Sequence, residues 1–258
     1  MDVTAHLPDD PAVEIRAGVF RPDWSVVTKR RAREALAGRL AARAGLLDRW
    51  ALRLEAVEDL VWRTILRLYA DCGRPPTLAD IVSANGIAPD GLKDVLQTLR
   101  SHDLIDLDPH TGNLRLAYPF TQATTGHRVQ IREHALHALC AIDALGVAGM
   151  YGTDVAISSR CHHCGAPVRV ETASEGKALR SVTPSGAAVW YDFAYDASAA
   201  TSCCPAIAFF CSDKHRRQWL DDQMPRRHGI GLTMDEALEV GRAIFSPILV
   251  EGSSDTQT

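Results

Sequence analysis

The sequence of 258 residues lacks the signatures of the most common enzyme classes. It contains no G-x-x-x-x-G-K-[ST] phosphate loop, no G-x-G-x-x-G fingerprint, no G-x-S-x-G elbow and no H-E-x-x-H zinc motif. These absences leave nucleotide-binding enzymes, α/β-hydrolases and zincin proteases without support. Any chemistry must come from other side chains.

Long apolar runs and an excess of positive charge are also missing. No stretch of 18 apolar residues occurs, and the N-terminus has no basic start followed by an apolar segment, so we expect neither a membrane span nor a signal peptide. The net charge of -4 does not favour binding of the whole chain to nucleic acid or to anionic lipid. With 46% hydrophobic residues the chain can bury a core, and we expect a soluble, cytoplasmic protein.

Cysteine is what the sequence does have. Seven are present, which is an odd number, and six of them lie after residue 139. In a reducing compartment this distribution indicates thiol chemistry or metal binding rather than disulfides. We therefore expect the functional site in the C-terminal half of the chain.

The chain is predicted to divide into three parts. Residues 1–24, rich in Pro and Asp without periodicity, are predicted to form a poorly ordered extension. Residues 25–120 are predicted to form a helical, winged-helix-like domain, with helices over about 25–53 and 57–72, two short helices from Thr77 and Pro89, and a hairpin around 108–112. The many arginines of the first helix, Arg39 among them, are expected on a solvated surface.

Residues 121–258 are predicted to form an α+β catalytic domain that carries the thiols. A helix is expected over 131–145, followed by a mostly antiparallel sheet with strands near 154–159, 167–171, 187–193 and 206–211. Two helices close the chain, one opened by Ser212 and one by the capping box Thr233-Met-Asp-Glu236. The predicted fold class is therefore α+β, with helices flanking the sheet.

A winged helix often binds DNA through its second helix. Here that helix is near neutral, because it carries Asp90, Lys93, Asp94 and Arg100. Phosphate contacts need net positive charge, so a structural role is favoured over nucleic-acid binding.

Cys140 and Asp143 are the first candidates for chemistry. If their segment is helical, the three-residue spacing puts both on one face, close enough for proton exchange. In the alternative, Cys140 is a small buried residue on a helix whose core stripe is Ala135, Leu139 and Ile142. A carboxylate does not belong in such a stripe, which favours a chemical role.

The pair Cys203-Cys204 precedes an apolar strand and supplies further thiols. Neighbouring residues of an extended chain point to opposite sides, so at most one of the pair is expected to face the pocket of Cys140. The other is expected to pack or to assist from the rim.

Cys161-His-His-Cys164-Gly165 resembles one knuckle of a zinc ribbon, which is half of a site. Cys203, Cys204 or Cys211 would complete a tetrahedral set only if the fold brought them in. A packing or redox-accessory role for Cys161 and Cys164 is therefore favoured over structural zinc.

Paired thiolates select soft metals such as mercury or copper(I). The run His137-Ala-Leu-Cys140-Ala-Ile-Asp143-Ala-Leu, then Val155 to Cys161 with Gly165-Ala-Pro-Val, then Ser202-Cys203-Cys204, resembles the organomercurial (alkylmercury) lyases in order and spacing. Trp219, Gly231-Leu and residues 236–241 fit that family's C-terminal pattern. The resemblance covers roughly residues 127–247, whereas the winged-helix-like region matches mainly in arrangement.

The resemblance implies that Cys140 and Cys203 are the catalytic cysteines and mercury ligands, and that Asp143 is the catalytic aspartate. Cys161 matches a structural cysteine, and Cys164 and Cys204 are treated as accessory thiols. The chain departs from the family at Leu139, where familiar members have Trp, and in its additional Cys164 and Cys211. These departures leave the catalytic triad intact.

The implied reaction is protonolysis of R-Hg⁺ to R-H and Hg²⁺, with Asp143 as general acid and no required cofactor. Small-molecule thiols, or the cysteine pair of a mercuric reductase, would take the Hg²⁺ product. Two alternatives stay open: a non-catalytic metal-binding or metal-sensing protein with a winged helix, and a structural zinc protein.

Overall fold

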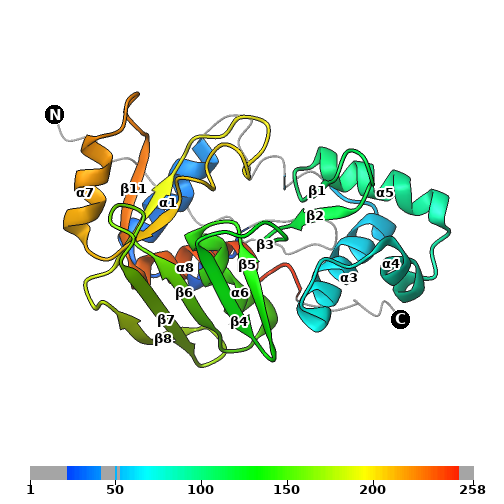
Figure 1. Ribbon diagram of the computed structural model, residues 1–258, viewed down its shortest axis with the longest axis horizontal. Coiled ribbons are helices and arrows are strands. Elements are labelled where there is room, and N and C mark those ends of the chain that lie inside the picture. Colours follow the sequence, from blue (N-terminus) through cyan, green and yellow to red (C-terminus); the bar gives the residue numbers. More distant parts are fainter. Residues whose placement is uncertain (1–21, 42–49, 51–52, 250–258) are drawn as a thin grey trace.

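The computed structural model describes residues 22–41, 50 and 53–249. The predicted extension over 1–24 therefore lies outside the described residues, apart from its last three. In the described part, helices pack around two antiparallel sheets (Figure 1), which confirms the predicted α+β class. None of the described helices has both the length and the apolar character needed to cross a membrane.

The N-terminal region has the predicted order of elements. A short 3₁₀ turn, Trp24–Val26, leads into α1 (Arg30–Ala41), which begins later than the helix predicted over 25–53; residues 42–49 and 51–52 of that prediction lie outside the described residues. Then come α3 (Ala56–Cys72), α4 (Leu78–Asn85), α5 (Pro89–Ser101) and the hairpin of β1 (Ile105–Leu107) and β2 (Leu114–Ala117). Local chemistry fixes these bounds, since Thr77 and Asp80 form a capping box and Gly73 ends α3 in the left-handed region.

The large sheet continues from that hairpin. Its further strands are β3 (Phe120–Thr121), β4 (His127–Ile131), β5 (His134–Ala138), β6 (Ala156–Arg160), β7 (Pro167–Ala173) and β8 (Ala178–Thr183). The strand order is β1-β2-β3-β5-β4-β6-β7-β8, and every described neighbour pair is antiparallel.

The second sheet has the order β10-β9-β11, built from β9 (Ala188–Asp192), β10 (Ala208–Phe210) and β11 (Gly229–Thr233). The helices of this half are α6 (Ala141–Tyr151), α7 (Asp213–Asp221) and α8 (Met234–Phe245). Ser212 and the Thr233 capping box begin α7 and α8 as predicted.

The helix predicted over 131–145 is wrong in its first two thirds. Strands β4 and β5 form a hairpin there, with Val129 paired to Leu136, and the helix begins only at Ala141. The segment around β5 is rich in Ala, Leu and His and poor in β-branched residues, so local propensity indicated a helix. Pairing with β4 buries Leu136 and Ala138 against the core, and this tertiary gain outweighs the propensity.

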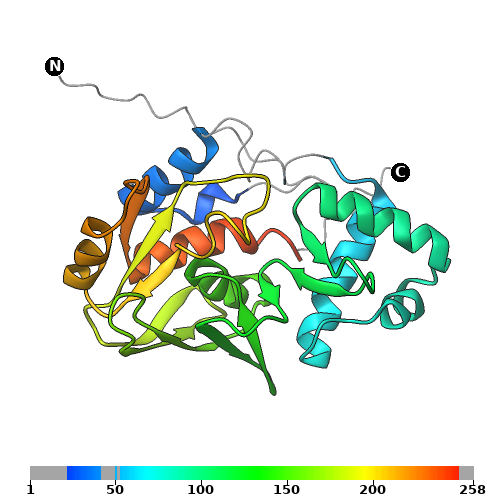
Figure 2. The same cartoon turned by 45° about the horizontal axis from the view of Figure 1, so that its top comes forward.

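Helices α6 and α8 form the centre of the C-terminal half. Figure 2 shows α8 in the middle of the body, with α1 on one side and the large sheet on the other. Glycines let α6 and α8 approach closely: a Cβ on Gly146 would lie 2.2 Å from Phe245, and one on Gly241 would lie 2.9 Å from the Gly146 nitrogen. This crossing holds the N-terminus of α6 inside the protein.

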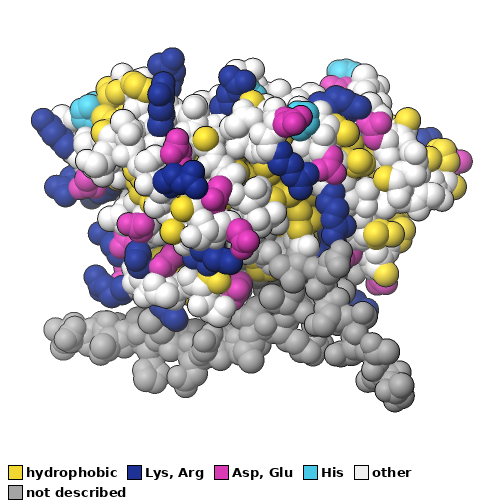
Figure 3. All heavy atoms as spheres, turned by 90° about the horizontal axis from the view of Figure 1, so that it is seen from below, with side chains coloured by type: hydrophobic (Ala, Val, Ile, Leu, Met, Phe, Trp, Pro, Cys, Tyr) yellow, Lys and Arg dark blue, Asp and Glu magenta, His cyan; other side chains and the backbone are white. Residues whose placement is uncertain are grey.

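We predict that the full chain does not bind duplex DNA through residues 77–120. This segment has three basic residues against six acidic ones, and its cations are already paired: Lys93 with Asp90 at 3.3 Å, Arg100 and Arg115 with Asp106 at 3.3 and 2.9 Å. Basic and acidic side chains are also intermixed on the face drawn in Figure 3. Binding measured at physiological salt should vanish with competitor DNA, and a surviving footprint would contradict the prediction.

Candidate active site

Cys140 is the N-cap of α6. Its backbone is extended, with φ -145 and ψ 177, and its Sγ accepts a hydrogen bond from the Asp143 backbone N–H at 3.4 Å. Both side chains are buried. The predicted closeness of Cys140 and Asp143 therefore holds, but it comes from a capping contact rather than from a shared helix face.

The Cys203-Cys204 pair lies on a series of tight turns rather than on an extended chain. Backbone bonds run from Ser202 N to Ser198 O at 3.1 Å and from Cys204 N to Ala199 O at 2.9 Å, and β10 begins only at Ala208. The prediction that at most one of the pair faces the pocket of Cys140 is wrong. Because the chain curls here, both thiols line the same cavity as Cys140 and Asp143.

The two thiols have different neighbours within the cavity. The Cys204 Sγ, the Cys140 Sγ and an Asp143 carboxylate oxygen lie within 4.8 Å of one another, and the Cys204 thiol points at Asp143 Oδ2 over 3.9 Å. The Cys203 thiol instead donates to the Ala199 carbonyl at 3.8 Å and lies beside the Arg39 guanidinium. Of the pair, Cys204 is thus the one nearer to Asp143, and Cys203 is the one beside Arg39.

The cavity is small and mostly apolar. Its volume is about 20 Å³, which is room for about one water molecule. Besides the thiols and the carboxylate, its lining is largely aromatic and aliphatic: Trp50, Tyr118, Ile142, Tyr191, Ile207, Ile244 and Phe245. Bulk water is therefore kept away from the sulfurs and the carboxyl group.

Burial and hydrogen bonding separate the proton affinities of these groups. Burial raises the pKa of Asp143 to about 7 and that of Cys140 to about 12. Hydrogen bonds with Cys140 and Cys203 hold the pKa of Cys204 well above its usual value. A hydrogen bond from Cys204, helped by the Arg39 charge, lowers the pKa of Cys203 to about 6 against the effect of burial. Of the three cavity thiols, Cys203 is accordingly the one that ionises most readily.

Arg39 is a site residue that the sequence analysis missed. Its side chain is 1% exposed, so its predicted place on a solvated helix surface is wrong. The guanidinium donates to the Asp192 carbonyl at 2.7 Å and to the Tyr191 hydroxyl at 3.3 Å. The signal was present in the spacing, because Ala32, Ala35, Leu36 and Arg39 follow the i, i+3, i+4, i+7 pattern of one buried helix face.

The N-terminal region also supports the turn that carries the cysteine pair. The Asp103 carboxylate accepts from the Ala199 backbone N–H at 2.9 Å and from the Tyr195 hydroxyl at 3.1 Å. Trp50 lines the cavity and donates to the Asp103 carbonyl at 3.0 Å. Residues far apart in the sequence thus set the position of Cys203 and Cys204.

Cys161 and Cys164 do not join this cavity. They lie in a second group with Cys211 and His215, two residues that follow β10 in the chain. The cavity thus brings together Cys140, Asp143, Cys203 and Cys204, and Cys161 and Cys164 lie outside it.

The fold and the cavity define an α+β protein that offers thiols and a carboxylate, out of water, to a soft metal. The alkylmercury lyase family model matches residues 120–246. Similar proteins include the alkylmercury lyases of Bacillus cereus, 32% identical over 76% of this chain and 86% of the relative, and of Staphylococcus epidermidis, 33% identical over 73% and 83%. That of Streptomyces lividans is 28% identical over 73% and 83%.

The chain belongs to the alkylmercury lyase family, as the sequence resemblance predicted. It is an organomercurial lyase, an enzyme that cleaves the carbon–mercury bond. The fold agrees with the solved structure titled "Crystal structure of the mercury-bound form of MerB2", with a TM-score of 0.65 and 24% identity over 76% of this chain and 93% of that one.

We predict that Arg39→Met moves the acid limb of the pH profile of kcat/KM to higher pH. Without the guanidinium the pKa of Cys203 rises from about 6 toward its ordinary value, and each pKa unit lowers the thiolate fraction at acidic pH about tenfold. Iodoacetamide labelling of Cys203 against pH, read by peptide mass spectrometry, measures this shift directly. Arg39→Lys should restore part of the effect, and Arg31→Met on the exposed face of α1 is the matched control. An unchanged labelling profile in a folded Arg39→Met protein would refute the role.

Proposed function

We propose that Cys203 captures R-Hg⁺ as a thiolate, that Cys140 becomes the second mercury ligand, and that Asp143 carries the proton to carbon. The observation that supports these three roles is that Cys203, Cys140 and Asp143 have different pKa values within one small, mostly apolar cavity. Among the cavity thiols, Cys203 has the lowest pKa, about 6, while Cys140 keeps its proton and the pKa of Asp143 is about 7.

Capture comes first. The thiolate is the nucleophilic and metal-binding form of cysteine, and a soft cation such as R-Hg⁺ prefers it to oxygen ligands. Arg39 beside Cys203 keeps that thiolate available at neutral pH. The organomercurial cation is therefore drawn to Cys203.

Proton transfer follows when mercury reaches Cys140. Coordination to a metal deprotonates a thiol, even one whose pKa is raised by burial. The carboxyl group of Asp143 lies next to that sulfur, since both belong to the same capped helix start. Asp143 is thus placed to accept the proton of Cys140.

Cleavage then uses the same proton. The second thiolate raises the electron density on mercury and on its carbon, the C–Hg electron pair stays with carbon, and Asp143 delivers the proton there. One thiolate, one thiol and R-Hg⁺ give a neutral bis-thiolate mercury complex and R-H, so charge and atoms balance. General acid catalysis of this kind is typically worth about 10²–10⁴ in rate.

Cys204 has an accessory role in this scheme. Its thiol points at Asp143 Oδ2 over 3.9 Å and hydrogen-bonds to Cys203, so it stabilises the charged forms of both partners. The chemistry uses side chains alone and needs no resident cofactor. Release of Hg²⁺ requires competing thiols, either small molecules or the cysteine pair of a mercuric reductase, and such reduced thiols are available in the cytoplasm.

The proposed division of the chain into residues 1–24, 25–120 and 121–258 assigns the reacting groups to the last part. The middle part contributes Arg39, which lowers the pKa of Cys203, and Asp103, which accepts a hydrogen bond from Ala199 in the turn that carries Cys203 and Cys204. Both parts are therefore needed for a competent site.

Cys140→Ser and Cys203→Ser are each expected to abolish hydrocarbon release, because a hydroxyl is a hard and weakly acidic ligand that cannot replace a thiolate on mercury. Cys204→Ser should be milder. Methane in the headspace after incubation with methylmercury and excess thiol measures the rate. Since the Cys204 thiol points at Asp143 Oδ2 over 3.9 Å, the reverse result, with an inactive Cys204→Ser and an active Cys203→Ser, would assign the second thiolate to Cys204.

Asp143→Asn is expected to bind mercury without cutting the carbon–mercury bond. Binding needs the two thiols, whereas cleavage also needs a titratable proton, so methane release should fall at least about a hundredfold. Mercury retained on the protein after desalting measures binding separately. If the variant releases methane at the wild-type rate, the proton comes from a cysteine or from water instead.

A further inference from the structure

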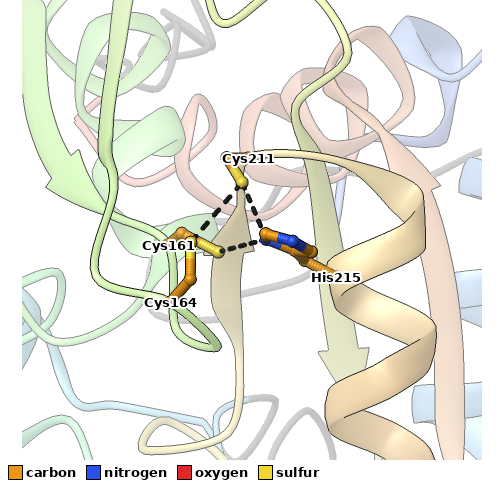
Figure 4. A group of neighbouring side chains, drawn as sticks. All are labelled: Cys161, Cys164, Cys211 and His215. Carbon is orange, nitrogen blue, oxygen red and sulfur yellow. Dashed lines mark hydrogen bonds between the residues drawn. The ribbon is translucent and has the colours of Figure 1, made fainter.

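A second set of metal-binding side chains lies outside the cavity, and the lyase reaction gives it no role. Cys161, Cys164, Cys211 and His215 offer three sulfurs and one ring nitrogen, all within 4.8 Å of one another. Figure 4 shows the four side chains converging from the turn after β6 and from the segment that begins α7. From this convergence we propose that the four residues bind one zinc ion.

The distances between these atoms fit a tetrahedral site. With Zn–S bonds of about 2.3 Å, two sulfur ligands of a tetrahedron lie about 3.8 Å apart. The Cys164 and Cys211 sulfurs are 3.8 Å apart, and the Cys161 Sγ lies 3.8 Å from His215 Nδ1. The Cys211 Sγ to His215 Nδ1 distance of 3.0 Å is shorter, so this edge must lengthen by a fraction of an ångström when zinc binds.

The backbone builds the first half of the site as a knuckle. Gly165 donates to the Cys161 carbonyl at 2.8 Å and Cys161 donates to the Ala166 carbonyl at 2.7 Å, which closes a tight turn around the two thiols. Gly165 has φ +72, a left-handed conformation that disfavours side chains. The turn therefore holds Cys161 and Cys164 on one side of the chain.

The second half comes from the start of α7. Ser212 caps this helix by accepting from the His215 backbone N–H at 3.2 Å, and the cap fixes His215 one turn after Cys211. The two halves are joined by a bond from the His162 N–H to the Phe209 carbonyl at 2.9 Å. The sequence named Cys211 as one of three thiols that could complete the set and gave no sign of His215, because the fold alone brings the start of α7 to the knuckle.

The ligand set selects zinc and a structural role. Three thiols and an imidazole form a Cys₃His set, and magnesium or calcium would require oxygen ligands instead. Four protein ligands also leave no open position for a substrate, unlike a catalytic zinc site. Zinc here would hold the fold together and would take no part in proton transfer.

The position of the zinc site relative to β10 indicates what the metal would stabilise. Strand β10 follows the Cys203-Cys204 turn and leads directly to Cys211, so zinc would fix the far end of the segment that carries the active-site pair. At the near end, the Ile207 carbonyl accepts from the Ala141 N–H at 3.0 Å, next to Cys140. A short segment would thus be anchored at both ends.

Metal analysis of the purified full-length protein tests the proposal. We expect about one zinc per chain in the wild type, in Cys140→Ser and in Cys72→Ser, which changes an exposed thiol outside both clusters. Cys164→Ser and His215→Ala should lose it. Chelation should lower the Tm of the wild type and leave that of Cys164→Ser unchanged.

A second measurement covers the case in which the variants fail to fold. Zinc added back to metal-free wild-type protein should protect Cys161, Cys164 and Cys211 from alkylation, as read by peptide mass spectrometry, and should leave Cys72 reactive. Lack of protection by zinc, protection by Hg²⁺ alone, or full zinc retention in folded Cys164→Ser would each overturn the assignment.

Discussion

The hydrogen bond between the Asp143 N–H and the Cys140 sulfur sets the geometry on which the candidate active site depends. It makes the thiol the first group of a buried helix and places the carboxylate at the third helical position. The helix itself is held in place, because Gly146 and Gly241 bring α6 and α8 into backbone contact against Phe245. Sulfur and carboxyl group are therefore fixed relative to the core, and the cavity forms around them.

Burying several titratable groups in one cavity is costly unless their charges are balanced. Here the Arg39 guanidinium favours the thiolate form of Cys203, while burial keeps the Cys140 thiol neutral and raises the pKa of Asp143 to about 7. Carbonyls of Asp192 and Ala194 and the Tyr191 hydroxyl accept hydrogen bonds from Arg39, so its charge is solvated by the protein. In the proposed reaction, the cationic substrate binds first to the Cys203 thiolate, whose pKa is lowered to about 6.

Sequence patterns predicted those parts of the fold that local chemistry determines. The helix starts at Thr77 and Pro89, the Thr233 capping box and the Ser212 cap all follow from nearby residues, and each was confirmed. The closeness of Cys140 and Asp143 was also predicted, though for the wrong reason. An i, i+3 spacing across a helix start gives the same proximity as one within a helix.

The errors share a physical cause, which is pairing between distant segments. The β4–β5 hairpin replaced a helix because its partner strands were not visible in the local pattern. Both cysteines of the pair face the cavity because Asp103, a hundred residues earlier, holds the turn. Arg39 was predicted on the surface, because its hydrogen-bond acceptor, the Asp192 carbonyl of β9, lies far away in the sequence. Burial of the guanidinium can be predicted only when that acceptor is known.

The presence of two thiol clusters raises the question of why R-Hg⁺ would bind in the cavity rather than at Cys161, Cys164 and Cys211. R-Hg⁺ binds any accessible thiolate, and Cys164 is exposed whereas the cavity thiols are buried. Without a bound metal, Cys161, Cys164 and Cys211 would compete with Cys203 for the substrate. R-Hg⁺ bound to them would lie away from Asp143, the proposed proton donor. With zinc bound as proposed, those three sulfurs are already shared with a metal. The Cys203 thiolate is then favoured, because it combines a lowered pKa with a proton donor in the same cavity.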